Sequence, residues 1–179
     1  MEITAFAKYD WKTIKKFNHF HNFKKNKLKR ATVPILLITL AINISGFAVC
    51  FFLDEFDSTL TTLLIIEVLL VLLLLFSWFI MPRINFNLNK IAKNNRNEYI
   101  FKDETFSVSC ESNGMSGNSE IKYKNVRCFY ETKEYIYVYI NMNQAFIVDK
   151  SSFTEGSIEE LRMHLISLIG NEKYKIVLK

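Results

Sequence analysis

The sequence predicts an α+β membrane protein: a transmembrane hairpin of two helices followed by a cytoplasmic antiparallel β-barrel or β-sandwich that a C-terminal helix caps. Three observations predict this class. Residues 32–53 and 60–81 are apolar and long enough to cross the hydrocarbon core of a bilayer, which takes about 20 helical residues. Basic residues flank this pair. From Tyr99 onward, apolar residues alternate as in strands, until a single helical pattern appears near the C-terminus.

Residues 1–31 contain a predicted strand and a basic amphipathic helix. Residues 2–9 alternate loosely between apolar and polar positions, and Asp10 is a suitable N-cap for the helix that follows. Aromatic and aliphatic residues then recur on one side of this helix: Trp11, Ile14, Phe17 and Phe20. That side suits either the membrane interface or the protein's own β domain, and the pattern favours neither.

Residues 32–53 form the first predicted transmembrane helix, residues 54–59 an external acidic turn, and residues 60–81 the second transmembrane helix. The second helix contains one charged residue, Glu67. An ionisable residue within the membrane is costly, which makes Glu67 a candidate functional residue. When protonated, it could hydrogen-bond to Asn43 or Ser45 of the first helix, so these three residues form a candidate intramembrane polar contact.

Basic residues on both sides of the hairpin orient it. The candidates for contact with anionic lipid headgroups are Lys24, Lys25, Lys27, Lys29, Arg30 and Arg83. Positively charged segments stay in the cytoplasm, so we expect both termini to be cytoplasmic. The formal net charge of +5 arises from these flanks, while residues 99–179 are nearly neutral. We therefore expect a bilayer with anionic headgroups as a partner, and no nucleic acid.

Residues 82–98 are predicted to form a juxtamembrane helical connector with an asparagine-rich end, and residues 99–179 a β domain. The predicted strands of this domain are residues 99–102, 105–110, 119–123, 126–132, 135–140 and 144–149, with a turn-rich loop at 111–118. Ser157 and Glu160 have the spacing of a capping box for a helix that Gly170 ends. A last extended piece covers residues 173–178.

Several motifs together resemble a known family. An Asp10-Trp11 helix start precedes His19-Phe20-His21, a basic run and the apolar hairpin. The later motifs are Ile121–Val126, Tyr130-Glu-Thr132, Ala145–Lys150 with Phe153, and Glu159-Glu-Leu-Arg162. In this arrangement the chain resembles the YcxB-like bacterial membrane proteins. The resemblance implies a pleckstrin-homology-like C-terminal domain, a location in the bacterial cytoplasmic membrane, and no established enzymatic activity.

No catalytic, phosphate-binding or metal-binding motif is recognisable, so we expect a non-enzymatic protein without a cofactor. The favoured function is a membrane-anchored scaffold or protein-interaction module that binds a protein partner or forms a homo-oligomer at the cytoplasmic face. One alternative is an immunity or protection protein against a membrane-acting toxin or bacteriocin. Another is a small accessory subunit of a transporter or channel.

Overall fold

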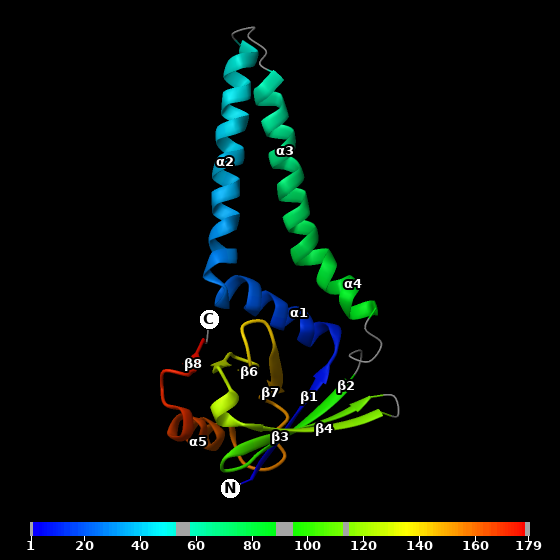
Figure 1. Cartoon of the computed structure of the whole chain (residues 1–179), viewed down its shortest axis with the longest axis vertical. Coiled ribbons are helices and arrows are strands. Elements are labelled where there is room, and N and C mark those ends of the chain that lie inside the picture. The colour runs from blue at the N-terminus through cyan, green and yellow to red at the C-terminus, as the bar shows by residue number, and fades with distance from the viewer. Residues whose placement is uncertain (1, 53–57, 89–94, 113–114, 178–179) are drawn as a thin grey trace. The chain divides into compact units, whose positions relative to one another are not determined.

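The computed structural model describes residues 2–52, 58–88, 95–112 and 115–177 of the 179-residue chain (Figure 1). The chain divides into two compact units. One unit combines Met1–Phe17 with Asn89–Lys179 and contains every strand found in the described residues. The other spans Asn18–Leu88, and its described residues are mainly helical. Most of the predicted acidic turn, residues 54–57, lies outside the described residues.

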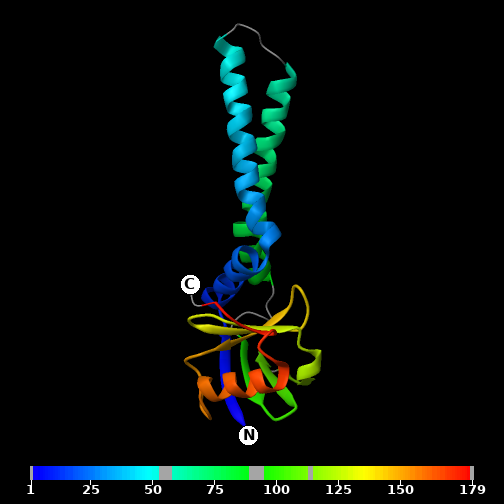
Figure 2. The ribbon, with the colours of Figure 1, turned by 90° about the vertical axis from the view of Figure 1, so that its left-hand side faces the viewer.

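The helical unit is a hairpin in which α2 (Lys27–Phe52) and α3 (Ser58–Leu75) run side by side (Figures 1 and 2). A π-helical turn (Phe76–Ile80) joins α3 to α4 (Met81–Leu88). Pro82 explains this turn, since a proline has no N–H for the carbonyl four residues earlier and its ring collides with that carbonyl. After this wider turn the helix continues past Pro82 to Leu88, within the first part of the predicted juxtamembrane connector.

Half-buried and buried side chains in the hairpin follow one seam on each helix. On α2 they include Leu36, Leu40, Asn43, Phe47 and Cys50, and on α3 Leu64, Glu67, Val71 and Leu74. Spacings of three and four residues are typical of two helices packed along a single seam. Ala31–Phe52 and Thr61–Leu88 are long and apolar enough, by length and composition, to cross a membrane.

The first sheet contains β1 (Ile3–Tyr9), β2 (Asn95–Phe101), β3 (Thr105–Ser112) and β4 (Met115–Lys122), in that order and antiparallel. β1 pairs with β2 along its whole length, from Ile3 opposite Phe101 to Tyr9 opposite Asn95. The N-terminal strand predicted at residues 2–9 is confirmed, and its backbone groups find their partners in a strand that follows the hairpin.

The second sheet contains β5 (Cys128–Glu131), β6 (Tyr135–Tyr139), β7 (Ala145–Asp149) and β8 (Tyr174–Ile176). Its order is β7-β6-β5-β8, and the β5–β8 pair is parallel. A short 3-10 turn, Tyr123–Asn125, precedes β5. Across the described residues the two sheets stay separate and do not close into a barrel, so the barrel alternative is wrong. The α+β class with antiparallel-rich sheets is confirmed.

Two element boundaries differ from the prediction. The asparagine-rich segment Asn95–Asn97, predicted as a linker, is the start of β2, and the predicted loop at 111–118 is mostly strand. Asn95 and Asn97 are buried and bond to Cys110 of β3: Asn95 Nδ2 donates to the sulfur at 3.2 Å, and the thiol donates to Asn97 Oδ1 at 2.7 Å. Partners on a neighbouring strand thus override the weak strand propensity of asparagine.

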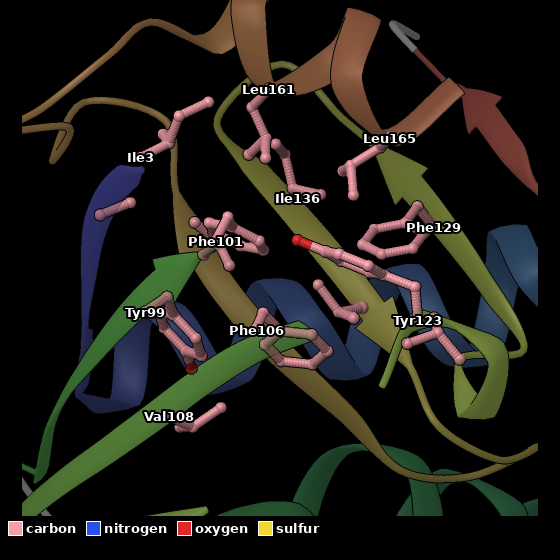
Figure 3. Packing of buried hydrophobic residues seen from close by; sticks show 14 of the residues in the cluster. Ile3, Tyr99, Phe101, Phe106, Val108, Tyr123, Phe129, Ile136, Leu161 and Leu165 are labelled. Atoms are coloured by element: carbon pink, nitrogen blue, oxygen red, sulfur yellow. The ribbon is translucent and has the colours of Figure 1, made fainter. Parts of the chain in front are cut away.

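A helix near the C-terminus, α5 (Ile158–Ile169), covers the core between the sheets. The predicted capping box is confirmed: Glu160 N donates to Ser157 Oγ at 3.2 Å, and Ser157 N donates to Glu160 Oε2 at 3.0 Å. Figure 3 shows Leu161 and Leu165 pointing from α5 toward aromatic and aliphatic side chains of both sheets.

The N-terminal helix α1 (Trp11–His19) packs on the second sheet. Thr13 N donates to Asp10 Oδ1 at 2.8 Å, so the predicted N-cap is confirmed. Thr13 is buried, with its hydroxyl 3.4 Å from that of Tyr135, and the Phe17 ring lies 5.4 Å from the Tyr137 ring. Of the two interpretations of this helix, packing on the protein's own domain is therefore correct.

The contact between Gly156 and β1 yields a stability prediction. Gly156 has φ +74°, and a Cβ there would lie 2.9 Å from Ile3 Cγ1. We expect Gly156→Ala to lower the free energy of unfolding by about 2–4 kcal/mol, through overpacking and backbone strain. In an Ile3→Ala background the added cost of Gly156→Ala should shrink, because the colliding Cγ1 and Cγ2 atoms of Ile3 are gone.

Thermal unfolding of the full chain in detergent measures this coupling. Gly170→Ala is the control, since Gly170 also has a positive φ (+78°) but open space around its Cβ position. Strictly additive effects of Gly156→Ala and Ile3→Ala would contradict the proposed contact.

Candidate functional site

Each unit buries one carboxylate. Glu67 in the helical unit is 7% exposed and Glu131 in the β unit is 0% exposed; they are the only buried acidic residues among those described. A buried carboxylate is costly unless other groups bond to it or compensate its charge. The partners of these two side chains therefore show what each can do.

Glu67 bonds across the hairpin. Asn43 Nδ2 of α2 donates a hydrogen bond to Glu67 Oε2 of α3. The third predicted member, Ser45, instead donates to the carbonyl of Ala41 in its own helix, at 2.8 Å. The structure therefore brings together two of the three predicted residues, in an intrachain contact on the seam between α2 and α3.

Glu131 lies at the end of β5, where four donor groups from other segments converge on it. Arg162 of α5 donates through Nε to Oε2 at 2.8 Å and through Nη2 to Oε1 at 2.6 Å. Lys150, directly after β7, donates to Oε1 at 2.7 Å, and the Tyr174 hydroxyl of β8 donates to Oε2 at 2.7 Å. We call Glu131, Lys150, Arg162 and Tyr174 the Glu131 cluster.

Electrostatics stabilise the ionised form of Glu131. Burial alone would raise its pKa, but the hydrogen bonds from Arg162, Lys150 and Tyr174 outweigh burial and lower the pKa to about 2. The hydrogen bond with Glu131 raises the pKa of Arg162, and burial together with this carboxylate raises the pKa of Tyr174. Glu131 is therefore an anion at neutral pH.

The geometry limits the chemistry that Glu131 could perform. A carboxylate has about four acceptor positions, and the cluster supplies four hydrogen bonds. A general base needs a free position toward its substrate and a pKa near the working pH. The Glu131 cluster meets neither condition, and its role is to hold β5, α5, β8 and the end of β7 together.

Sequence reasoning missed Glu131 as a site residue, although a signal was present. Phe129 and Glu131 share one face of β5, and Phe129 is a core residue with 0% exposure. Strand alternation therefore places the Glu131 side chain toward the core, where an acidic residue requires cationic partners.

A second polar cluster joins the first sheet to β7. The hydroxyl groups of Tyr9 and Tyr99 lie 3.1 Å apart. Asn97 Nδ2 donates to the Tyr99 hydroxyl at 3.3 Å, and the backbone N–H of Ile147 donates to the Tyr9 hydroxyl at 3.1 Å. Burial raises the pKa of both tyrosines. Both therefore stay neutral and act as structural hydrogen-bonding groups.

The candidate lipid-contact residues all belong to the helical unit. Lys24 and Lys25 end a π-helical segment (Phe20–Lys25), and Arg83 lies exposed on α4. Lys27, Lys29 and Arg30 belong to the first turns of α2, and their side chains lie outside the described residues. Within the described parts of the chain, no three metal-ligating side chains gather where they could hold an ion.

Part of the chain matches a known protein family. Residues 101–165 match the family described as YcxB-like protein. Over these residues the chain is similar to that family, and we call them the YcxB-like segment. The YcxB-like segment contains Glu131, Lys150 and Arg162, which the family resemblance had included as motif residues without a role. No curated protein and no solved structure matches the chain.

Removing the charge of Glu131 should destabilise the YcxB-like segment. We expect Glu131→Gln to lower the free energy of unfolding at neutral pH by about 3–5 kcal/mol, because Arg162 and Lys150 lose their buried counter-charge. The matched control is Glu172→Gln, an exposed acid, with an expected change within about 0.5 kcal/mol. Equal effects of the two substitutions in chemical unfolding of the full chain would contradict the structural role.

The same carboxylate predicts a pH dependence. Its pKa is lowered on folding, so its stabilisation is complete above the unfolded pKa of about 4.5 and is lost as the pH falls toward about 2. The loss should reach about 3 kcal/mol in the wild type. Glu131→Gln should lack this component, which the difference between the two unfolding curves from pH 7 to pH 2.5 measures. Parallel curves would show that Glu131 does not titrate with a depressed pKa.

The Asn43–Glu67 contact should be separable from the apolar packing of the hairpin. We expect Glu67→Gln to be tolerated, because an amide still bonds to Asn43, and Glu67→Leu to weaken the hairpin by about 1 kcal/mol. In the Glu67→Leu background, the further change Asn43→Leu should lower the stability of the hairpin only slightly, because the hydrogen bond is already lost. Thermal unfolding in detergent measures this cycle, and additive penalties would refute the contact.

Proposed function

We propose that the chain is a non-enzymatic integral membrane protein of the bacterial cytoplasmic membrane. Its hairpin anchors a protein-interaction scaffold with a pleckstrin-homology-like fold at the cytoplasmic face. The observation that carries this proposal is the exposure of the apolar hairpin.

The outer surfaces of α2 and α3 are almost entirely apolar and uncovered. The most apolar windows of the two spans are 0% and 6% buried, whereas a core helix of a soluble protein is mostly buried. Ile42 and Leu73, for example, are 65% and 63% exposed. Exposing such side chains to water costs about 25 cal/mol per Å² of apolar surface, and lipid chains remove this cost.

The polar groups of the hairpin support the same placement. Glu67 is turned onto the seam and bonds to Asn43, so the outward faces present little but hydrocarbon. Lys24 and Arg83 lie beyond the apolar segments, where anionic headgroups would be found. The distribution of positive charge favours cytoplasmic termini.

The β unit supports a binding role over a catalytic one. Its buried carboxylate is saturated by hydrogen bonds, and its buried tyrosines are neutral at physiological pH. A role as transporter subunit would require Glu67 on an accessible pathway, and its burial against Asn43 favours a structural contact instead. A rigid β unit on a membrane anchor is suited to presenting a surface to a partner.

Cysteine accessibility tests the topology. In a chain whose Cys50, Cys110 and Cys128 are replaced by serine or alanine, we expect Ser58→Cys to react with an impermeant thiol reagent in intact cells. Lys124→Cys should react only after permeabilisation, because it lies in the β unit. Resistance of the chain to carbonate extraction checks insertion itself. Labelling of Lys124→Cys but not Ser58→Cys in intact cells would reverse the orientation, and full release by carbonate would exclude a membrane anchor.

A further inference from the structure

We propose that two copies of the chain associate through β4, which pairs antiparallel with the β4 strand of the second copy about a two-fold axis at Asn118. The two first sheets thereby become one continuous sheet. This inference rests on the proposed scaffold function and names a second copy of the chain as its partner.

The other outer strands of the two sheets are covered or short. Thr4 of β1 exchanges backbone hydrogen bonds with the segment at 154–155, and Phe6 bonds through both backbone groups to Ser152 Oγ. β7 is approached by β1, and its Ile147 N–H donates to Tyr9. β8 has only three residues.

β4, in contrast, is an eight-residue outer strand. Among the described residues, its backbone has strand partners only in β3. An outer strand presents a row of unpaired N–H and C=O groups to a further strand.

The middle of β4 lacks the features that keep outer strands from pairing, and its two charged residues, Glu120 and Lys122, lie near its C-terminal end. Natural sheets protect such strands with proline, bulges or charged side chains. β4 contains no proline, and its register with β3 is unbroken from Lys122 to Met115. Its middle residues, Ser116 to Ser119, are exposed, small and uncharged. This strand is therefore open to antiparallel addition of another strand.

Charge favours this register over the one with its axis at the next residue, Ser119. With the axis at Asn118, Ser116 lies opposite Glu120 of the second copy, and no like charges are opposite or diagonal. An axis at Ser119 would instead place the two Glu120 side chains diagonally across the pair, where they repel. Thr105 donates to Glu120 Oε1 at 2.7 Å, which leaves Oε2 for the Ser116 hydroxyl of the second copy. A two-fold interface makes every such contact twice.

Disulfide formation in membranes containing the full, otherwise cysteine-free chain tests both the pairing and its register. Directly opposite strand residues have Cα atoms about 4.5–5.5 Å apart, within the reach of a disulfide. We expect Asn118→Cys to give a cross-linked dimer on mild oxidation. Glu120→Cys alone should give none, but it should cross-link to a co-expressed Ser116→Cys chain.

A charge variant provides the second measurement. Asn118→Lys places two ammonium groups opposite one another, and we expect it to lower the dimer fraction at least tenfold in light scattering of the detergent-solubilised chain. The matched control, Asn143→Lys in the exposed turn between β6 and β7, should leave the dimer intact. Unchanged thermal unfolding of the monomeric variant would show that it is folded.

Several outcomes would overturn the pairing: a monomeric wild type, a dimer that survives Asn118→Lys, or a folded Asn118→Cys chain that does not cross-link. The membrane-anchored topology is read independently, from the labelling of Ser58→Cys and Lys124→Cys. A failed dimer with the expected labelling would refute only the β4 interface, whereas reversed labelling would refute the proposed placement.

Discussion

The β unit depends on the pairing of β1 with β2, because the chain leaves the first sheet after Tyr9 and returns to it only at Asn95. A strand without a neighbour leaves its backbone groups unpaired, so residues 3–9 have no stable structure until the hairpin has been made and the later strands arrive. Ile3, Ala5 and Ala7 are each at most 2% exposed in the core that this pairing completes. The long loop between the two strands adds little entropic cost per residue, and the helical unit within it is itself ordered.

The Glu131 cluster constrains the second sheet in a different way. β5 has four residues and β8 three, too few to define a register by backbone bonds alone. The buried Glu131 carboxylate bonds to Arg162, Lys150 and Tyr174. These bonds fix the positions of α5, β8 and the end of β7 relative to β5. Buried ion pairs often contribute little net stability, but breaking one is costly, and in this protein we regard the cluster as a device for specificity.

Both units bury a small number of polar groups, and these groups bond to one another inside the unit. Glu67 of the hairpin bonds to Asn43, and the outward faces are largely hydrocarbon, as the proposed placement in a bilayer requires. The first sheet uses its buried tyrosines and asparagines internally and presents a plain backbone edge at β4. In the proposed function, anchoring and association therefore use separate surfaces of the protein.

The sequence by itself determined the features that depend on neighbours within a few residues. These include the two apolar helices, the capping box at Ser157, the helix end at Gly170 and the alternation of residues 2–9. Only the tertiary structure decided which of Asn43 and Ser45 would bond to Glu67, that α1 would pack on the second sheet, and that Asn95–Asn97 would be strand. It also decided that the sheets would remain open and that Glu131 would gather three partners. These outcomes depend on contacts between residues far apart in the chain, and periodicity and capping contain no information about such contacts.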